Sequence, residues 1–332
     1  MANMCSRCAA LLLLGAVNAQ AMGSRSIPLL LLGAVVAQDI YSVTVTIDGV
    51  DRTLRFTSND DFLALARDHL PDADIQGGRD AAAARVAAVM EAAVTRRNVE
   101  LYRSVWDGYA DRWRADKHGV GVANEHRDAS TPLVWLGDEW GPRGDFLEVF
   151  ESYVAPHLPP GGNVAEIGVG GGRVAARVAP RVARLHAFDV SSSMLALARE
   201  TLAGFDNVAF TLLAEPRFDA ALHGTFDFVY AFDAFVHVDL HTMWRYFQQF
   251  ALVLKPGGRG YVSTGNLMTE RGFERFASQA EATQIGFYFM TPDMVRRLLA
   301  KAGLAVVRES PEVPGNLLLE RDFLVVFERP AS

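Results

Sequence analysis

The chain has 332 residues, of which 50% are hydrophobic and 21% are charged. This composition is typical of a globular protein with a large core, and it excludes a disordered chain. The formal net charge of -7 argues against nucleic acid as the default partner. Because the only cysteines are Cys5 and Cys8, the chain past residue 8 has no cysteine-based metal site and no thiol nucleophile.

Residues 1–38 contain an internal repeat. Two copies, which begin near Met4 and Met22, each combine an arginine, a short apolar run and small residues. This outline is typical of a secretory signal peptide, although each run is shorter than the roughly 20 residues that span a bilayer. We therefore expect a duplicated, signal-like leader that directs the protein to the secretory route or an organelle. The alternative is a cytoplasmic protein whose true start lies downstream.

Residues 39–78 predict a small appendage made of a β-hairpin and a helix. Apolar and polar side chains alternate over residues 41–47, as in a half-buried strand. Asp48-Gly49 is a strong hairpin turn, and the return strand continues through Leu54 and Phe56. No catalytic chemistry is visible here, so we expect a packing or recognition role.

Residues 79–150 are expected to form a helical region and a linker. One helix is predicted over residues 80–95, which are rich in alanine, and another over residues 101–113. The second helix carries four large aromatic residues at helical spacings, which indicates a packed face. Aromatic and acidic residues mix over residues 135–141, a segment that we expect to border a pocket.

Residues 151–332 alternate between predicted strands and helices. This alternation predicts an α/β fold, a doubly wound seven-stranded and mostly parallel sheet, with ligands at the carboxyl ends of the strands. A hairpin between the last two strands would make one strand antiparallel. The strands are expected near residues 163–168, 184–189, 207–213, 225–231, 258–264, 304–309 and 322–328, and the main helices near 172–180, 192–203, 240–254 and 292–302.

The first of these strands ends in a glycine-rich turn. Glycine is needed where the backbone approaches a ligand closely or takes positive φ, and a helix start beyond the turn suits a polar ligand. A dinucleotide fingerprint would require glycine or alanine where Arg173 stands, and a P-loop would require Gly-Lys-Ser/Thr. The motif present is Glu-x-Gly-x-Gly-x-Gly, formed by Glu166, Gly168, Gly170 and Gly172.

This motif resembles that of class I S-adenosylmethionine-dependent methyltransferases. The resemblance covers about residues 135–332, because residues 184–194, 226–230 and 254–258 are similar to the family's later motifs in the same order. It implies a Rossmann-like methyltransferase that uses S-adenosyl-L-methionine and methylates an oxygen, nitrogen or sulfur nucleophile of a small molecule. A non-catalytic scaffold that binds the same cofactor is the alternative, and a dinucleotide-dependent oxidoreductase ranks third.

The resemblance also indicates which residues hold the cofactor. The three glycines would approach it, and Asp189, at the end of the second strand, would accept both ribose hydroxyls. Glu166 would hold the glycine loop or reach the methionine ammonium group, and Met194 would pack on the adenine. The family usually has an acidic residue after the third strand, where this chain has Ala214. Either Glu215, the next residue, substitutes through a shift of one position, or the adenine is held by backbone groups alone.

Phe232, Asp233 and His237 follow the fourth strand, where the transferred methyl group would lie. If this segment is helical, Asp233 and His237 share a face at i,i+4. A histidine can take a proton from the acceptor, and a carboxylate can orient it or bind a cationic substrate. We expect these two residues to be catalytic, the alternative being a structural histidine and a capping aspartate. The acceptor pocket is expected to include residues 263–266 and 287–290, and no metal site is predicted.

Overall fold

The computed structural model describes residues 30–37, 40–47, 50–70, 78–116, 133–280 and 286–331. The expected leader before residue 30 and the expected Asp48-Gly49 turn lie outside these residues. Contacts divide the chain into two compact units, Met1–Asn98 and Val99–Ser332. The boundary falls inside one helix, α2 (Gly78–Ala115), which contributes to both units.

The first unit is a three-stranded antiparallel sheet packed against helices, with the strand order β1-β2-β3. Its strands are β1 (Leu30–Ala37), β2 (Ile40–Ile47) and β3 (Val50–Phe56), and its helices are α1 (Phe62–His69) and the first half of α2. The alternation predicted for the hairpin is confirmed, since Tyr41, Val43 and Val45 are buried together with Leu54 and Phe56. Because one face of this sheet packs against the helices, the period of two follows directly from burial.

Strand β1 is a feature that the sequence did not predict. Its residues form the apolar run of the second expected leader copy, yet they pair with β2 in antiparallel register. An apolar run fits a leader and a strand equally well, so the pattern alone did not distinguish the two. The predicted hairpin is confirmed, because Ile47 pairs with Val50 and leaves two residues between β2 and β3.

The second unit is built on a mixed sheet with the strand order β10-β11-β8-β7-β4-β5-β6, and β9 pairs with β8. Neighbours from β8 to β6 are parallel, whereas β11 is antiparallel to both β8 and β10, as predicted. The strands are β4 (Asn163–Ile167), β5 (Arg184–Asp189), β6 (Val208–Leu212), β7 (Phe226–Ala231), β8 (Leu254–Asn266), β9 (Phe289–Met290), β10 (Ala305–Glu309) and β11 (Asp322–Glu328).

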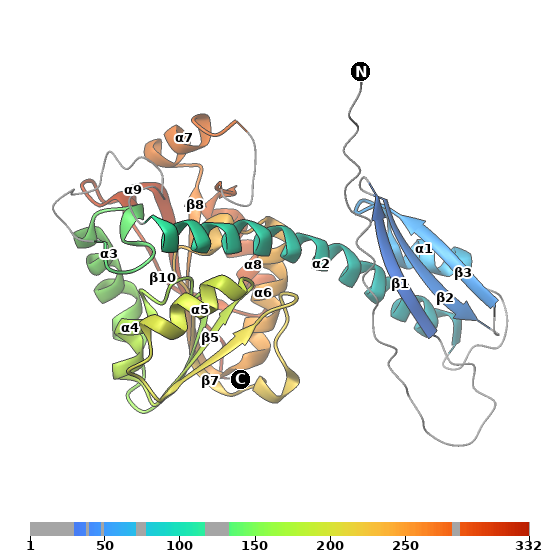
Figure 1. Ribbon diagram of the computed structural model, residues 1–332, viewed down its shortest axis with the longest axis horizontal. Helices are drawn as coiled ribbons and strands as arrows, with labels where there is room; N and C mark the ends of the chain where they lie inside the picture. The colour runs from blue at the N-terminus through green and yellow to red at the C-terminus, as the bar shows by residue number, and fades with distance from the viewer. Residues whose placement is uncertain are drawn as a thin grey trace. The chain divides into compact units, whose positions relative to one another are not determined.

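Helices cover both faces of this sheet, with α3 and α4 on one side and α6 and α8 on the other (Figure 1). A hydrophobic core lies on each face of the sheet, and alternate residues of β7 belong to each: Phe228 and Tyr230 pack on the α3 side, and Val229 and Ala231 on the α6 side. The helices are α3 (Arg143–Val149), α4 (Ala175–Val178), α5 (Ser192–Thr201), α6 (Leu240–Val253), α7 (Glu270–Ala277), α8 (Pro292–Lys301) and α9 (Leu317–Arg321). The predicted doubly wound α/β fold is confirmed.

Two helical segments differ from the prediction. Helix α2 is continuous over 38 residues, although two separate helices were predicted for this region. Residues 96–100 contain neither glycine nor proline, so nothing in the sequence stops the first helix. The connection between β10 and β11, expected to lack a helix, contains the short helix α9. Among the described residues, no helix is both long and apolar enough to cross a membrane.

Candidate functional site

The glycine turn after β4 has positive φ at three positions: 75° at Gly168, 52° at Gly170 and 87° at Gly172. A Cβ on Gly168 would lie 2.6 Å from the Cβ of Ala234, so this glycine allows the loop after β7 to approach. A Cβ on Gly170 would meet no atom within 4 Å. Gly170 therefore lies where the backbone faces open space, as required for close approach to a ligand.

A cavity lies at the carboxyl ends of β4, β5 and β7, bordered by the second half of α2. It contains about 1010 Å³ of space free of protein atoms, part of it open to solvent. The predicted site residues that line it are Glu166, Gly168, Gly170, Asp189, Met194, Phe232, Asp233 and His237. Residues that the motifs indicated one at a time are thus brought together by the parallel sheet.

Asp189 is buried at the end of β5 and holds the glycine turn in place. Its carboxylate accepts hydrogen bonds from the backbone N–H of Gly170 at 2.9 Å and of Ser191 at 2.9 Å. Burial raises the pKa of Asp189 to about 6, although these hydrogen bonds act in the opposite direction. Each carboxylate oxygen has a second lone pair, so Asp189 can still accept ligand hydroxyl groups.

Glu166 is buried beneath the glycine turn. The hydroxyl of Tyr230 donates a hydrogen bond to it at 2.7 Å, its sole hydrogen-bond partner among the described residues. Burial raises the pKa of Glu166 to about 8, and the neighbouring charge of Asp189 adds to this shift. Without a cationic partner the carboxyl group is therefore largely protonated at neutral pH, and a cation in the cavity would favour its ionised form.

Two predicted cofactor residues do not line the cavity. Gly172 packs against α5, where a Cβ would lie 3.3 Å from the Cα of Ala198. Glu215 forms an ion pair with Arg217 at 2.8 Å. From this part of the chain it is Leu213, at the end of β6, that reaches the cavity.

His237 lines the cavity, and a hydrogen bond fixes which of its ring nitrogens carries the proton. Its Nδ1 lies 2.8 Å from the carbonyl oxygen of Gly286, which can only accept, so Nδ1 carries the proton. Burial lowers the pKa of His237, which keeps the ring neutral. Nε2 therefore has a free lone pair, and it has no hydrogen-bond partner among the described residues. A neutral imidazole in this tautomer can accept a proton.

Asp233 and His237 do not share a helical face, because the segment after β7 does not form the α-helix that this arrangement would require. Asp233 has φ of 54° and precedes a short 3-10 turn (Phe235–His237). Its carboxylate pairs with Arg321 at 3.1 Å, and Arg321 also pairs with Asp322 at 2.6 Å. Sequence reasoning missed Arg321, because nothing near it in the chain indicates a partner about ninety residues away.

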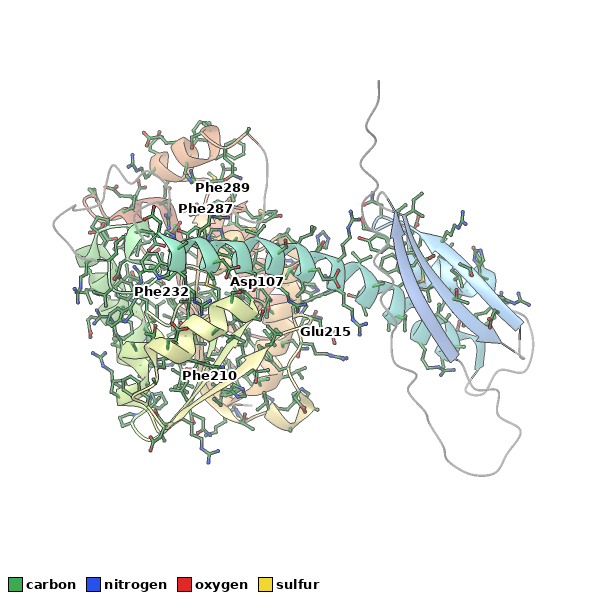
Figure 2. All side chains as sticks on the ribbon, in the orientation of Figure 1. Asp107, Phe210, Glu215, Phe232, Phe287 and Phe289 are labelled. Carbon is green, nitrogen blue, oxygen red and sulfur yellow. The ribbon has the colours of Figure 1, made fainter. Side chains whose placement is uncertain are left out.

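The second half of α2 is fastened across the carboxyl ends of the strands. Asp107 accepts hydrogen bonds from the Ser191 hydroxyl at 2.6 Å and the Ser193 backbone N–H at 3.0 Å, at the start of α5 (Figure 2). The Tyr102 hydroxyl donates to Asp239 at 3.1 Å. Tyr102 and Trp106 line the cavity, so the aromatic face predicted for this helix covers the site.

The segment predicted to border a pocket does so through Leu136 and Trp140. Its fold is fixed by Glu139, which accepts hydrogen bonds from the Tyr109 hydroxyl at 2.9 Å and the Gly137 backbone N–H at 2.7 Å. Arg173 donates to the carbonyl oxygen of Gly137 and is buried. The arginine that interrupts a dinucleotide fingerprint therefore has a structural role in this turn.

Neither segment predicted for the acceptor pocket lines the cavity. Both lie directly behind residues that do. The Ser263 hydroxyl accepts a hydrogen bond from the Asp233 backbone N–H at 2.8 Å, and the Phe287 ring lies 5.4 Å from the His237 ring in an edge-on arrangement. In the described part of the chain, no group of three side chains is arranged to bind a metal ion.

A family model and several solved structures are similar to parts of this chain. Residues 164–258 match a family model described as a methyltransferase domain. No curated protein matches the chain. Similar solved structures include a SAM-dependent methyltransferase from Methanosarcina mazei (16% identity, 55% of this chain and 98% of that chain, TM-score 0.44). Another is the N-methyltransferase NodS from Bradyrhizobium japonicum (18% identity, 57% of this chain and 98% of that chain, TM-score 0.44). A third is a geranyl diphosphate C-methyltransferase from Streptomyces coelicolor (14% identity, 55% of this chain and 78% of that chain, TM-score 0.44).

The matched residues contain the glycine turn, Asp189 and the whole of β7. The chain therefore contains a methyltransferase domain, and S-adenosyl-L-methionine is the cofactor that its glycine motif predicts. The residues present fit this molecule. Gly170 leaves room for close approach, Asp189 can accept hydroxyl groups, and Glu166 is an acid whose ionised form a bound cation would favour.

Proposed function

We propose that this protein transfers a methyl group to an oxygen, nitrogen or sulfur nucleophile of a small molecule, with His237 as the general base. The position of the cavity beneath α2 supports a small acceptor. Tyr102 and Trp106 of α2 border it, so a macromolecular substrate would have to displace a helix that is held by several hydrogen bonds.

The observation that carries the proposal is the hydrogen bond between His237 Nδ1 and the Gly286 carbonyl. It leaves Nε2 as the basic atom, in a ring that also lies 4.8 Å from the ring of Trp106. Both aromatic neighbours meet His237 edge-on, and together with the hydrogen bond they fix its orientation. As the lone pair of the acceptor's nucleophilic atom attacks the methyl group, Nε2 of His237 accepts the proton that this atom loses.

When bound, S-adenosyl-L-methionine supplies a methyl group on a positively charged sulfur, which keeps the electron pair of the broken bond. The residues of the chain position the two reactants. Asp189 and Gly170 would hold the ribose of the cofactor, and Glu166 would face its cationic end. Asp233, which pairs with Arg321, lines the same cavity as His237. Alignment of two reactants is worth roughly 7–11 kcal/mol in well-oriented systems, so most of the rate enhancement would come from position.

The test compares His237→Asn with the wild type. Asparagine can still donate to the Gly286 carbonyl, so it removes the base and retains the hydrogen bond. We expect turnover, measured as S-adenosylhomocysteine formed with an acceptor found by screening small nucleophiles, to fall by about 10²–10⁴-fold. Affinity for S-adenosylhomocysteine should stay nearly unchanged.

His241→Asn is the matched control, because His241 is exposed at the start of α6 and does not line the cavity. It should retain full turnover. A structural role for His237 would instead lower the melting temperature and leave turnover per folded molecule normal. Cofactor binding without methyl transfer to any acceptor in the screen would favour the scaffold alternative.

A further inference from the structure

Aromatic rings form a continuous strip from the surface of α7 to His237, which lines the cavity. We call Phe273, Phe276, Phe289 and Phe287 the aromatic strip. Successive ring centroids along it are 5.9, 5.5 and 5.9 Å apart, and Phe287 lies 5.4 Å from His237. The strip thus connects the exterior with the residue proposed as the base.

The outer end of the strip is unusually open for aromatic residues. Phe273 is 53% exposed and Phe276 is 46% exposed, although both belong to a helix that packs on the sheet domain. Helix α7 follows β8, which is parallel to β7, so it stands at the same carboxyl edge as the cavity. Phe287 and Phe289 lie beneath it (Figure 2). This position is suited to an apolar molecule that enters the cavity.

A cation without a carboxylate partner lies beside the strip. The guanidinium group of Arg275 stacks on Phe287 at 5.2 Å, and no hydrogen bond or ion pair involves it among the described residues. The two neighbouring arginines do have carboxylate partners. Arg271 on the same helix pairs with Glu274 at 3.0 Å, and Arg321, on Phe287 at 4.5 Å, pairs with two aspartates. A partly buried, unpaired guanidinium is a site for an anion.

We propose that the methyl acceptor is a small apolar carboxylic acid whose carboxylate pairs with Arg275 while its apolar body lies on the aromatic strip. The nucleophilic atom would then reach His237 at the inner end of the strip. This inference rests on the proposed function and adds the substrate class to it. The charge of Arg321 is already matched by Asp233 and Asp322, so Arg275 is, among the described residues, the one guanidinium left beside the strip to pair with a ligand. A single guanidinium suits a carboxylate, whereas a phosphate dianion calls for more than one cation.

The test measures the binding of matched probes by calorimetry, with the full chain saturated with S-adenosylhomocysteine. The probes are 3-phenylpropanoate, its neutral amide 3-phenylpropanamide, and phenyl phosphate. We expect the carboxylate to bind the wild type about tenfold more tightly than the amide, and Arg275→Gln to abolish that difference. Arg271→Gln, on the same helix, should preserve it. Phe276→Ala should weaken both phenylpropanoate and its amide to a similar extent.

Several results would overturn the proposal: equal affinity for the carboxylate and the amide, an unchanged preference in Arg275→Gln, or no saturable binding of either probe. Tightest binding of phenyl phosphate would also contradict it. Failure of the proposed function is recognised separately, because it would appear as no methyl transfer to any acceptor in the screen, or as no binding of S-adenosylhomocysteine to wild type and variants alike. Probe binding is therefore also measured without S-adenosylhomocysteine.

Discussion

Glu166 and Asp189 are two carboxyl groups of one cavity with different acidities. Both are buried, but Asp189 accepts hydrogen bonds from backbone N–H groups at both oxygens, whereas Glu166 has only the Tyr230 hydroxyl. Hydrogen bonds from N–H groups stabilise a carboxylate, so Asp189 has a pKa of about 6 and Glu166 one of about 8. At neutral pH the cavity therefore holds one carboxylate and one largely protonated acid.

We predict that cofactor affinity rises with pH because of Glu166. Below pH 8 the free protein holds a proton on this carboxyl group, whereas the ammonium group of the cofactor favours the carboxylate, so binding releases the proton. Each unit of pH below 8 should then weaken binding by about tenfold. Calorimetry with S-adenosylhomocysteine between pH 6.5 and 8.5, in buffers of different ionisation enthalpy, measures both the affinity and the proton released.

Glu166→Gln is the matched variant, because it retains an acceptor for the Tyr230 hydroxyl and cannot ionise. Its affinity should be lower at pH 8.5 and nearly constant across the same range. A wild-type affinity that does not change with pH would show that Glu166 does not meet the ammonium group. In that case its role would be confined to supporting the glycine turn.

At the scale of the element, α2 is the part of the fold that encloses the site. Its attachment to α5 depends on Asp107, which supplies an acceptor for a backbone N–H in the first turn of that helix. We predict that Asp107→Ala destabilises the protein by about 1–2 kcal/mol, the usual effect of losing such a cap. The melting temperature should fall by roughly 2–4 °C for each kcal/mol, and S-adenosylhomocysteine should dissociate faster because the helix over the cavity is held less firmly.

Asp111→Ala is the control for this prediction. Asp111 lies one turn further along α2, its side chain is 69% exposed, and its one ion pair among the described residues is a 4.0 Å contact with Arg114. Its removal should change stability by less than about 0.5 kcal/mol. Equal dissociation rates for wild type and Asp107→Ala would mean that the cofactor leaves by a route that α2 does not control.

At the scale of the whole molecule, strand β1 places a limit on any processing of the N-terminus. We propose that the leader is cleaved and that the protein follows the secretory route or enters an organelle. Because β1 pairs along its length with β2, the mature chain should retain it. N-terminal sequencing of the protein from its native host should therefore find a start between about Ala19 and Leu29. An intact Met1 would contradict cleavage, and a start beyond Ala37 would show that β1 is dispensable.

The sequence by itself determined the fold class and most of the cavity residues that are expected to bind the cofactor, although Gly172 and Glu215 do not line the cavity. Glu166, Gly168, Gly170 and Asp189 lie at the ends of strands, and short-range patterns of burial and glycine reveal such positions. In a parallel sheet all those ends meet at one edge, so local information was sufficient to place them together. The family resemblance then indicated the cofactor.

The tertiary structure alone decided how the residues after β7 and the start of α5 are held in place. Arg321 reaches Asp233, the Gly286 carbonyl fixes the tautomer of His237, and Asp107 reaches the start of α5, each across at least 49 residues of sequence. Pairs so distant in the chain leave no periodic pattern in one sequence, because neither partner constrains the residues next to the other. Burial also set the acidity of Glu166, since desolvation depends on all the surrounding elements. The chemistry of this site therefore became readable only once the strands and α2 were packed.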